Sequence, residues 1–64
     1  MNNNEATIPK LLYTPVEAAQ TLGISRSTLY VLLANGSLDS VRIGGSRRIP
    51  ARALMSFVDQ LETQ

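Results

Sequence analysis

The 64-residue sequence contains no cysteine and no histidine. Without cysteine the chain can form neither a disulfide nor a thiolate metal site, which argues against a small secreted scaffold held by disulfides. Without histidine as well, the usual zinc sites and the common nucleophile–base pairs of enzymes cannot be built. We therefore expect a protein that is not an enzyme and that has neither a metal nor a cofactor.

Long hydrophobic runs are also missing. No apolar stretch approaches the roughly 20 residues that a membrane-spanning helix requires, and no signal-peptide pattern opens the chain. A chain of this length is expected to form one small domain with a small core. We expect it to be cytoplasmic and to have no membrane partner.

The sequence has little net charge, +1, which falls short of the strongly basic composition typical of nucleic-acid-binding proteins. The charges are unevenly spread, however. Residues 24–53 carry five arginines against Asp39 alone, a sum of +4, whereas Asp59 and Glu62 give residues 54–64 a sum of −2. Arginine suits bidentate contacts with phosphate and guanine. This distribution alone does not decide between a surface that binds nucleic acid and a basic surface that formed by chance.

One stretch, residues 14–33, predicts two short helices joined by a tight turn. Thr14 and Glu17 have the spacing of a capping box, in which each side chain bonds the other residue's backbone N–H at the start of a helix. Pro15 fits the first helical turn, where its missing N–H costs nothing. We therefore expect the first helix at about residues 15–22.

The second helix follows a turn that contains glycine. Gly23 suits the left-handed conformation that ends a helix, and Ser25 can cap a helix over about residues 26–34, which Gly36 would terminate. A short turn with glycine between two helices is typical of a helix-turn-helix. The outer face of the second helix carries an arginine, hydroxyls and an aromatic ring where a surface helix more often has Glu and Lys. Its residues are Arg26, Ser27, Thr28, Tyr30 and Val31.

Residues 40–50 predict a β-hairpin, because two β-rich runs flank a Gly-Gly-Ser turn. If the turn is centred on Gly45, Arg42 lies opposite Arg48, and three aliphatic residues share the core face. Like charges directly opposite each other are destabilising unless a polyanion neutralises them. The alternative is a shifted register, or an ion pair between these arginines and an acidic side chain. The expected core face carries Val41, Ile43 and Ile49, and the acidic candidates are Asp39 and Glu17.

The two ends of the chain have different patterns. Residues 1–10 show no apolar period, so we expect a disordered tail there and a domain over residues 11–62. The apolar run 11–13 can pack on the first helix or pair as a short strand with the hairpin. A last helix over about residues 51–61 has apolar residues at i, i+3, i+4 and i+7, which predicts a core-facing stripe. That stripe is Leu54, Phe57, Val58 and Leu61.

The expected order is the layout of a small winged helix-turn-helix of the α+β class, mostly α. Through LLYTPVEAAQTLGISRSTLYVLLANGSL, VRIGGSRRIP and ALMSFV, the sequence resembles the excisionase-type, MerR-related winged helix-turn-helix domains over about residues 11–61. The resemblance implies that the second helix reads the major groove of double-stranded DNA and that the hairpin, called the wing, contacts the backbone or the minor groove. The positions it implies on the helix are Ser25, Arg26, Ser27, Thr28 and Tyr30, and those on the wing are Gly45, Ser46, Arg47 and Arg48.

Individual roles follow from the side chains at these positions. Arg26 is the best candidate for a bidentate contact with guanine, whereas Ser25 is needed as a cap in any case. Tyr30 can bond a phosphate, and Arg42 joins the wing arginines as a phosphate contact. Val31 departs from the family pattern, because relatives often carry Arg or Lys there.

The resemblance also implies a function, that of a phage or mobile-element excisionase, or recombination directionality factor, in a bacterial host and associated with its nucleoid. Such a protein does not cut DNA. Several copies bind beside an attachment site, bend the DNA and help an integrase to favour excision. The integrase partner and the cooperative self-association are implied by the resemblance alone. The rival interpretations are a stand-alone transcriptional regulator and a module that binds an acidic protein.

Overall fold

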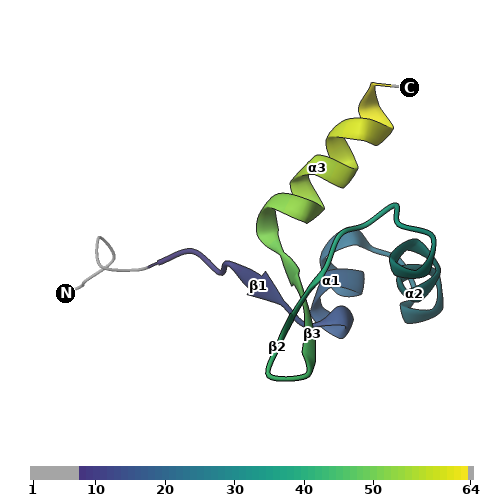
Figure 1. Ribbon diagram of the computed structural model, residues 1–64. Coiled ribbons are helices and arrows are strands. Elements are labelled where there is room, and N and C mark those ends of the chain that lie inside the picture. The colour runs from purple at the N-terminus through teal and green to yellow at the C-terminus, as the bar shows by residue number, and fades with distance from the viewer. Residues whose placement is uncertain (1–7, 64) are drawn as a thin grey trace.

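The computed structural model describes residues 8–63 of the chain. Within these residues lie three helices and three short strands, which form the expected α+β winged helix-turn-helix (Figure 1). The elements are β1 (Leu12–Tyr13), α1 (Pro15–Leu22), α2 (Arg26–Ala34), β2 (Val41–Ile43), β3 (Ser46–Pro50) and α3 (Ala51–Glu62). The two helices of the helix-turn-helix have the predicted bounds. Of the tail expected at residues 1–10, residues 1–7 lie outside the described part.

The predicted capping box and glycine turn define α1. The backbone N–H of Glu17 donates to Oγ1 of Thr14 at 3.1 Å, and the N–H of Thr14 donates to Oε1 of Glu17 at 3.0 Å. At the other end Gly23 has a φ of 73°, and the N–H of Ile24 donates to the carbonyl of Ala19 at 3.0 Å. Glycine adopts this left-handed conformation without the strain that most side chains would add, so Gly23 ends α1 and redirects the chain into α2.

A small core joins the helices to the sheet. Ala18 and Ala19 are buried on α1, and their short side chains let α1 pack closely against α2, where Leu29 is fully buried. Leu38, in the connection after α2, folds back onto this core. The buried apolar residues are Ala18, Ala19, Leu29, Leu38, Ile49, Ala53 and Leu54.

The sheet has the order β1-β3-β2, so β3 is its central strand. β1 pairs antiparallel with β3, with Leu12 opposite Pro50 and Tyr13 opposite Ile49. This pairing confirms that the run at residues 11–13 can form a short strand against the hairpin. β3 also pairs with β2 and then continues directly into α3. It therefore joins both other elements that follow α2 to the sheet.

The hairpin register centred on Gly45 is wrong by one residue. The turn consists of Gly44 and Gly45, whose φ angles are 56° and 84°. Two consecutive residues with positive φ form a two-residue type I′ turn, whose twist matches that of the flanking strands. The turn is therefore centred between the two glycines. The resulting pairs are Val41 with Arg48, Arg42 with Arg47, and Ile43 with Ser46.

This shift changes what each side of the wing presents. Ile49 is fully buried, but Ile43 is 56% exposed, so the expected shared core face does not form. The like-charge pair exists with a different member, because Arg47 rather than Arg48 lies opposite Arg42. Alternation along the strands places Arg42 and Arg47 on one face, opposite to the face that carries Ile43.

The last helix packs less completely than its apolar stripe predicted. Leu54 is buried and Phe57 packs against the core, but Val58 is 37% exposed and Leu61 is 56% exposed. Figure 1 shows α3 rising from the end of β3, with its C-terminal half extending beyond the sheet. The expectation that the whole stripe faces the core is therefore wrong for its C-terminal part.

Candidate nucleic-acid interface

The start of α2 is an exposed polar surface organised by its cap. Oγ of Ser25 accepts a hydrogen bond from the backbone N–H of Thr28 at 3.1 Å and donates to Oγ1 of Thr28 at 3.0 Å. Both side chains stay exposed, and each hydroxyl oxygen keeps a lone pair for a further donor. Ser25 therefore has a structural role, which Thr28 supports, and this role leaves room for a contact with an outside partner.

The outer face of α2 is exposed along its length. Arg26 and Ser27 are exposed, Tyr30 is 48% exposed and Val31 is 59% exposed, whereas Leu29 on the inner face is fully buried. One helical turn separates Arg26 from Tyr30, so the two lie on the same side of the helix. In the described part of the chain Arg26 has no ion-pair partner. The face thus offers one free guanidinium, hydroxyl groups and one aromatic ring.

The wing gathers three arginines on one hairpin. Nη1 of Arg42 donates to the carbonyl of Gly45 at 3.3 Å, and Nη1 of Arg48 donates to the carbonyl of Arg47 at 2.8 Å. These bonds hold two guanidinium groups against the wing backbone. Over residues 8–63, no carboxylate lies within ion-pair distance of these arginines. Their charge is therefore not neutralised, and the turn residues Gly45 and Ser46 beside them are exposed.

The acidic residues that could have paired with the wing are engaged elsewhere or exposed. Oε2 of Glu17 accepts from Nζ of Lys10 at 3.1 Å, the one ion pair in the described chain. The hydrogen bond from the backbone of Thr14, followed by that from Lys10, lowers the pKa of Glu17 below its ordinary value of 4.5. Asp39 is exposed and forms no ion pair in the described region. Of the two expected alternatives, the shifted register occurs, whereas pairing of wing arginines with Glu17 or Asp39 does not.

The helix face and the wing are held in place by a common element. α1 packs against both α2 and β3. It therefore fixes the position of the wing relative to the outer face of α2. Figure 1 shows the wing extending from the end of β3 that lies farthest from α3. The wing turn therefore lies away from α3.

These features fit a known family. A family model described as a helix-turn-helix domain matches residues 12–62, nearly all of the described chain. The chain belongs to this helix-turn-helix family. No solved structure is significantly similar to the helix-turn-helix chain.

Two curated relatives of this helix-turn-helix protein carry informative names. A "Probable excisionase" from Saccharopolyspora erythraea is 44% identical over 55 residues, which cover 86% of this chain and 56% of the relative. An "Excisionase" from Streptomyces ambofaciens is 41% identical over 54 residues, which cover 83% of this chain and 86% of the relative. The chain therefore spans little more than half the length of the first relative and most of the second.

The structure of the helix-turn-helix protein adds one residue to the predicted surface. Ile43, expected in the core, is exposed at the wing tip beside Gly44 and opposite Ser46. The signal for this position was present in the sequence, because a Gly-Gly dipeptide between two strands is typical of a two-residue type I′ turn. Within residues 8–63, no group of acidic residues could hold a metal ion, and no helix is long and apolar enough to cross a membrane.

Proposed function

We propose that this chain is an excisionase, a recombination directionality factor that binds double-stranded DNA and directs an integrase towards excision. The observation that carries DNA binding is the set of four arginines on α2 and the wing, none of which has an ion-pair partner in the described chain. Three of them lie on the wing and one begins α2. The assignment to excision is supported by the two relatives named as excisionases.

In this proposal α2 enters the major groove with its N-terminus leading. Arg26 donates to O6 and N7 of a guanine, a contact that discriminates against other bases by about 1–3 kcal/mol. The hydroxyls of Ser25, Ser27 and Thr28 and the phenol of Tyr30 bond phosphates and fix the register of the helix. Val31 contacts a thymine methyl or makes no contact, which leaves this helix with a single cation.

The wing supplies most of the charge that holds the DNA. Arg42, Arg47 and Arg48 contact phosphates, and Arg47 is close enough to the tip to enter the minor groove. The exposed backbone at Gly45 and the side chain of Ser46 approach the same strand. Neutralising phosphates on one side of the duplex and filling a groove lower the energy of a bent duplex. Bending of the attachment site is the step by which the protein assists recombination.

The protein itself takes no catalytic part in this scheme. The integrase breaks and rejoins the DNA, and several copies of this protein bind side by side on the bent site. Linked binding sites raise the effective concentration of neighbouring copies, so cooperation offsets the modest affinity of one small domain. This role places the protein on the nucleoid, in the cytoplasm of a bacterial cell.

Footprinting on two DNA regions tests the proposal. The protein is incubated with the attachment region of its own element and, separately, with the promoter of its own gene. Repeated protected sites beside the attachment core, together with stimulation of integrase-dependent excision, are expected. Protection confined to the promoter would instead identify a stand-alone transcriptional regulator.

Salt dependence separates DNA binding from attachment to an acidic protein. With about four phosphate contacts, log affinity for DNA is expected to fall with log salt at a slope of about −3 to −4. A flat response would remove the phosphate contacts from the proposal and favour a protein partner.

A further inference from the structure

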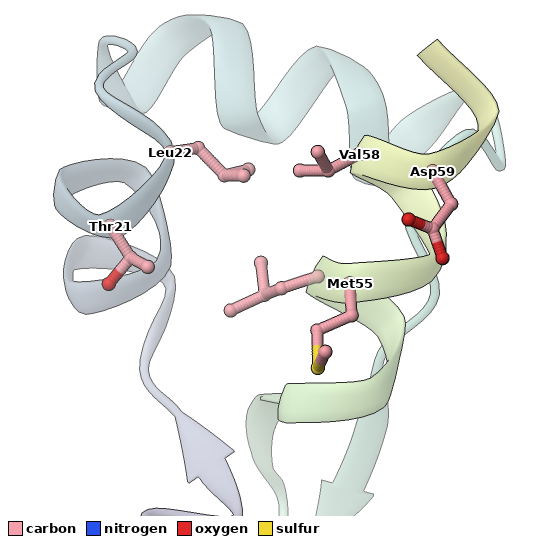
Figure 2. A pocket seen from close by; sticks show the side chains of 6 residues that line it. Thr21, Leu22, Met55, Val58 and Asp59 are labelled. Carbon is pink, nitrogen blue, oxygen red and sulfur yellow. The ribbon is translucent and has the colours of Figure 1, made fainter. Parts of the chain in front are cut away.

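α3 carries an apolar surface that the rest of the described chain leaves open. Met55 is 69% exposed, and Val58 and Leu61 on the same helix are partly exposed. Between α1 and α3 lies an open groove of about 280 Å³, which Leu22 helps to line. Figure 2 shows Leu22 and Val58 pointing toward each other across this groove, with Met55 and Asp59 along the α3 side. On an ordinary protein surface the exposed apolar residues are scattered singly, whereas here several of them lie next to one another.

The charges beside this surface follow a pattern. Met55 and Val58 form its centre and lie one turn apart. Arg52 and Asp59 are two turns apart on the same side of α3, one before this centre and one after it. Both are exposed, and neither has an ion-pair partner in the described chain. α3 therefore presents a basic end, an apolar middle and an acidic end along one edge.

We propose that this surface binds α3 of a second copy of the same chain, with the two helices antiparallel. In an antiparallel pair related by two-fold symmetry, the start of each helix lies beside the end of the other. Arg52 of each copy then meets Asp59 of the other, and Met55 packs against Val58. A parallel pair would place Arg52 beside Arg52 and Asp59 beside Asp59, so the charges select the antiparallel arrangement.

The size of the surface predicts how strong this contact is. A stable interface buries about 800 Å² on each partner, and a helix of 12 residues is only about 18 Å long. The pair is therefore weak in free solution and forms when two copies are held on neighbouring DNA sites. This role rests on the proposed DNA binding, although the contact itself does not. A symmetric pair further predicts that the neighbouring sites form an inverted repeat.

Charge reversal gives a test that depends on the antiparallel geometry. In a pair of Arg52→Glu chains, the new acid at position 52 meets Asp59 of the other copy at both symmetric contacts. In a pair of Asp59→Arg chains, the new base at position 59 meets Arg52 of the other copy at both contacts. Each variant alone is expected to associate on the order of tenfold more weakly. An equal mixture is expected to associate several-fold more strongly than either variant alone, because in each mixed pair every variant side chain meets an opposite charge. Sedimentation equilibrium at high protein concentration measures this without DNA, and binding to paired inverted sites measures it on DNA.

These two substitutions are suited to the test because they do not weaken α3. The first turn of α3 has no acidic residue and its last turn has no basic residue. A new acid at the start and a new base at the end both interact favourably with the helix dipole. The matched controls are Gln60→Glu and Gln60→Arg, at an exposed position on the side of α3 away from Met55. Neither control, alone or mixed, is expected to change association.

The outcomes separate this inference from the proposed function. If the mixture fails to restore association, or the Gln60 variants behave in the same way, the antiparallel contact is wrong. If single-site DNA binding is normal while association shows none of these responses, the proposed function stands and the α3 pair does not. If association responds as expected but no DNA is bound, the α3 pair stands and the proposed function fails.

Discussion

Arg42 and Arg47 lie directly opposite each other on the two strands of the wing, and in the described chain neither has a carboxylate partner. Two like charges at this spacing repel each other in the free protein. The phosphates of a DNA backbone would attract both arginines and neutralise the charges that repel each other. The pair therefore lowers the stability of the free wing and raises its affinity for DNA. The free energy of unfolding and the DNA affinity can be measured separately.

The first prediction concerns this pair. Arg42→Gln is expected to leave the free energy of unfolding unchanged or raise it by up to about 1 kcal/mol, because the repulsion is removed. The same variant is expected to bind DNA more weakly, with the magnitude of the salt slope reduced by about 0.9 if one phosphate contact is lost. Urea unfolding and binding at several salt concentrations measure the two effects. Binding is measured on a single site, where the α3 contact has no second copy to meet. Arg52→Gln, which removes an equal charge from α3, is the control there and is expected to keep the slope of the wild type.

The second prediction separates base recognition from backbone contact. Arg26→Ala is expected to reduce discrimination at one base pair by about 1–3 kcal/mol, because its guanine contact is lost. Arg48→Ala is expected to weaken binding to every sequence by a similar factor. Affinities for a set of single-base variants of the binding site distinguish the two patterns. Equal, uniform losses for both variants would show that Arg26 contacts only the backbone.

The third prediction concerns the turn of the wing. Gly44 has a φ of 56°, and no atom lies within 4 Å of the position a Cβ would take. Gly44→Val is therefore expected to destabilise the fold through backbone strain alone, by about 1–2 kcal/mol. Gly44→Asn is expected to be tolerated, because Asn accepts this conformation and Asn-Gly is favoured in type I′ turns. Thermal unfolding of the two variants tests this, and equal losses would count against a two-residue turn.

The fourth prediction concerns acid stability. Because the pKa of Glu17 is lowered in the folded state, the unfolded chain takes up this proton first as the pH falls. The stabilisation from ionised Glu17 is fully present above its ordinary pKa of 4.5 and is lost as the pH falls through the folded-state pKa. Glu17→Gln is therefore expected to lose stability near neutral pH and to show a flatter decline in acid. Urea unfolding at a series of pH values checks this, with Glu62→Gln as the exposed control; parallel curves for Glu17→Gln and wild type would contradict it.

Local signals predicted the helix-turn-helix well. The bounds of α1 and α2 follow from caps and glycines that act within a few residues, such as the box of Thr14 with Glu17 and the left-handed Gly23. Tertiary packing does not need to be known for these elements. The short β1 strand was also anticipated, although only as one of two alternatives for its apolar residues.

Two predictions were wrong, one because of the local geometry of a turn and one because of packing between distant elements. The hairpin register was assigned by centring the turn on Gly45, whereas backbone twist favours Gly44 and Gly45 together at positive φ. A shift of one residue moved Ile43 out of the expected core face. The stripe on α3 has a helical period whether or not another element covers it, so periodicity could not show that Val58 and Leu61 are partly exposed. The DNA-contact residues stay predictions, because their test requires DNA.

The passage of β3 into α3 without an intervening loop has a consequence for how this fold can vary. Pro50 ends the strand and Ala51 begins the helix, so no residue between them can absorb an insertion. An added residue there would reverse the facing of the strand or rotate the helix by about 100°. Differences in length between homologous domains should therefore occur at the wing turn, in the connection between α2 and β2, or at the ends of the domain. Along the segment from Ser46 to Glu62 the evolutionary record should contain substitutions and no gaps.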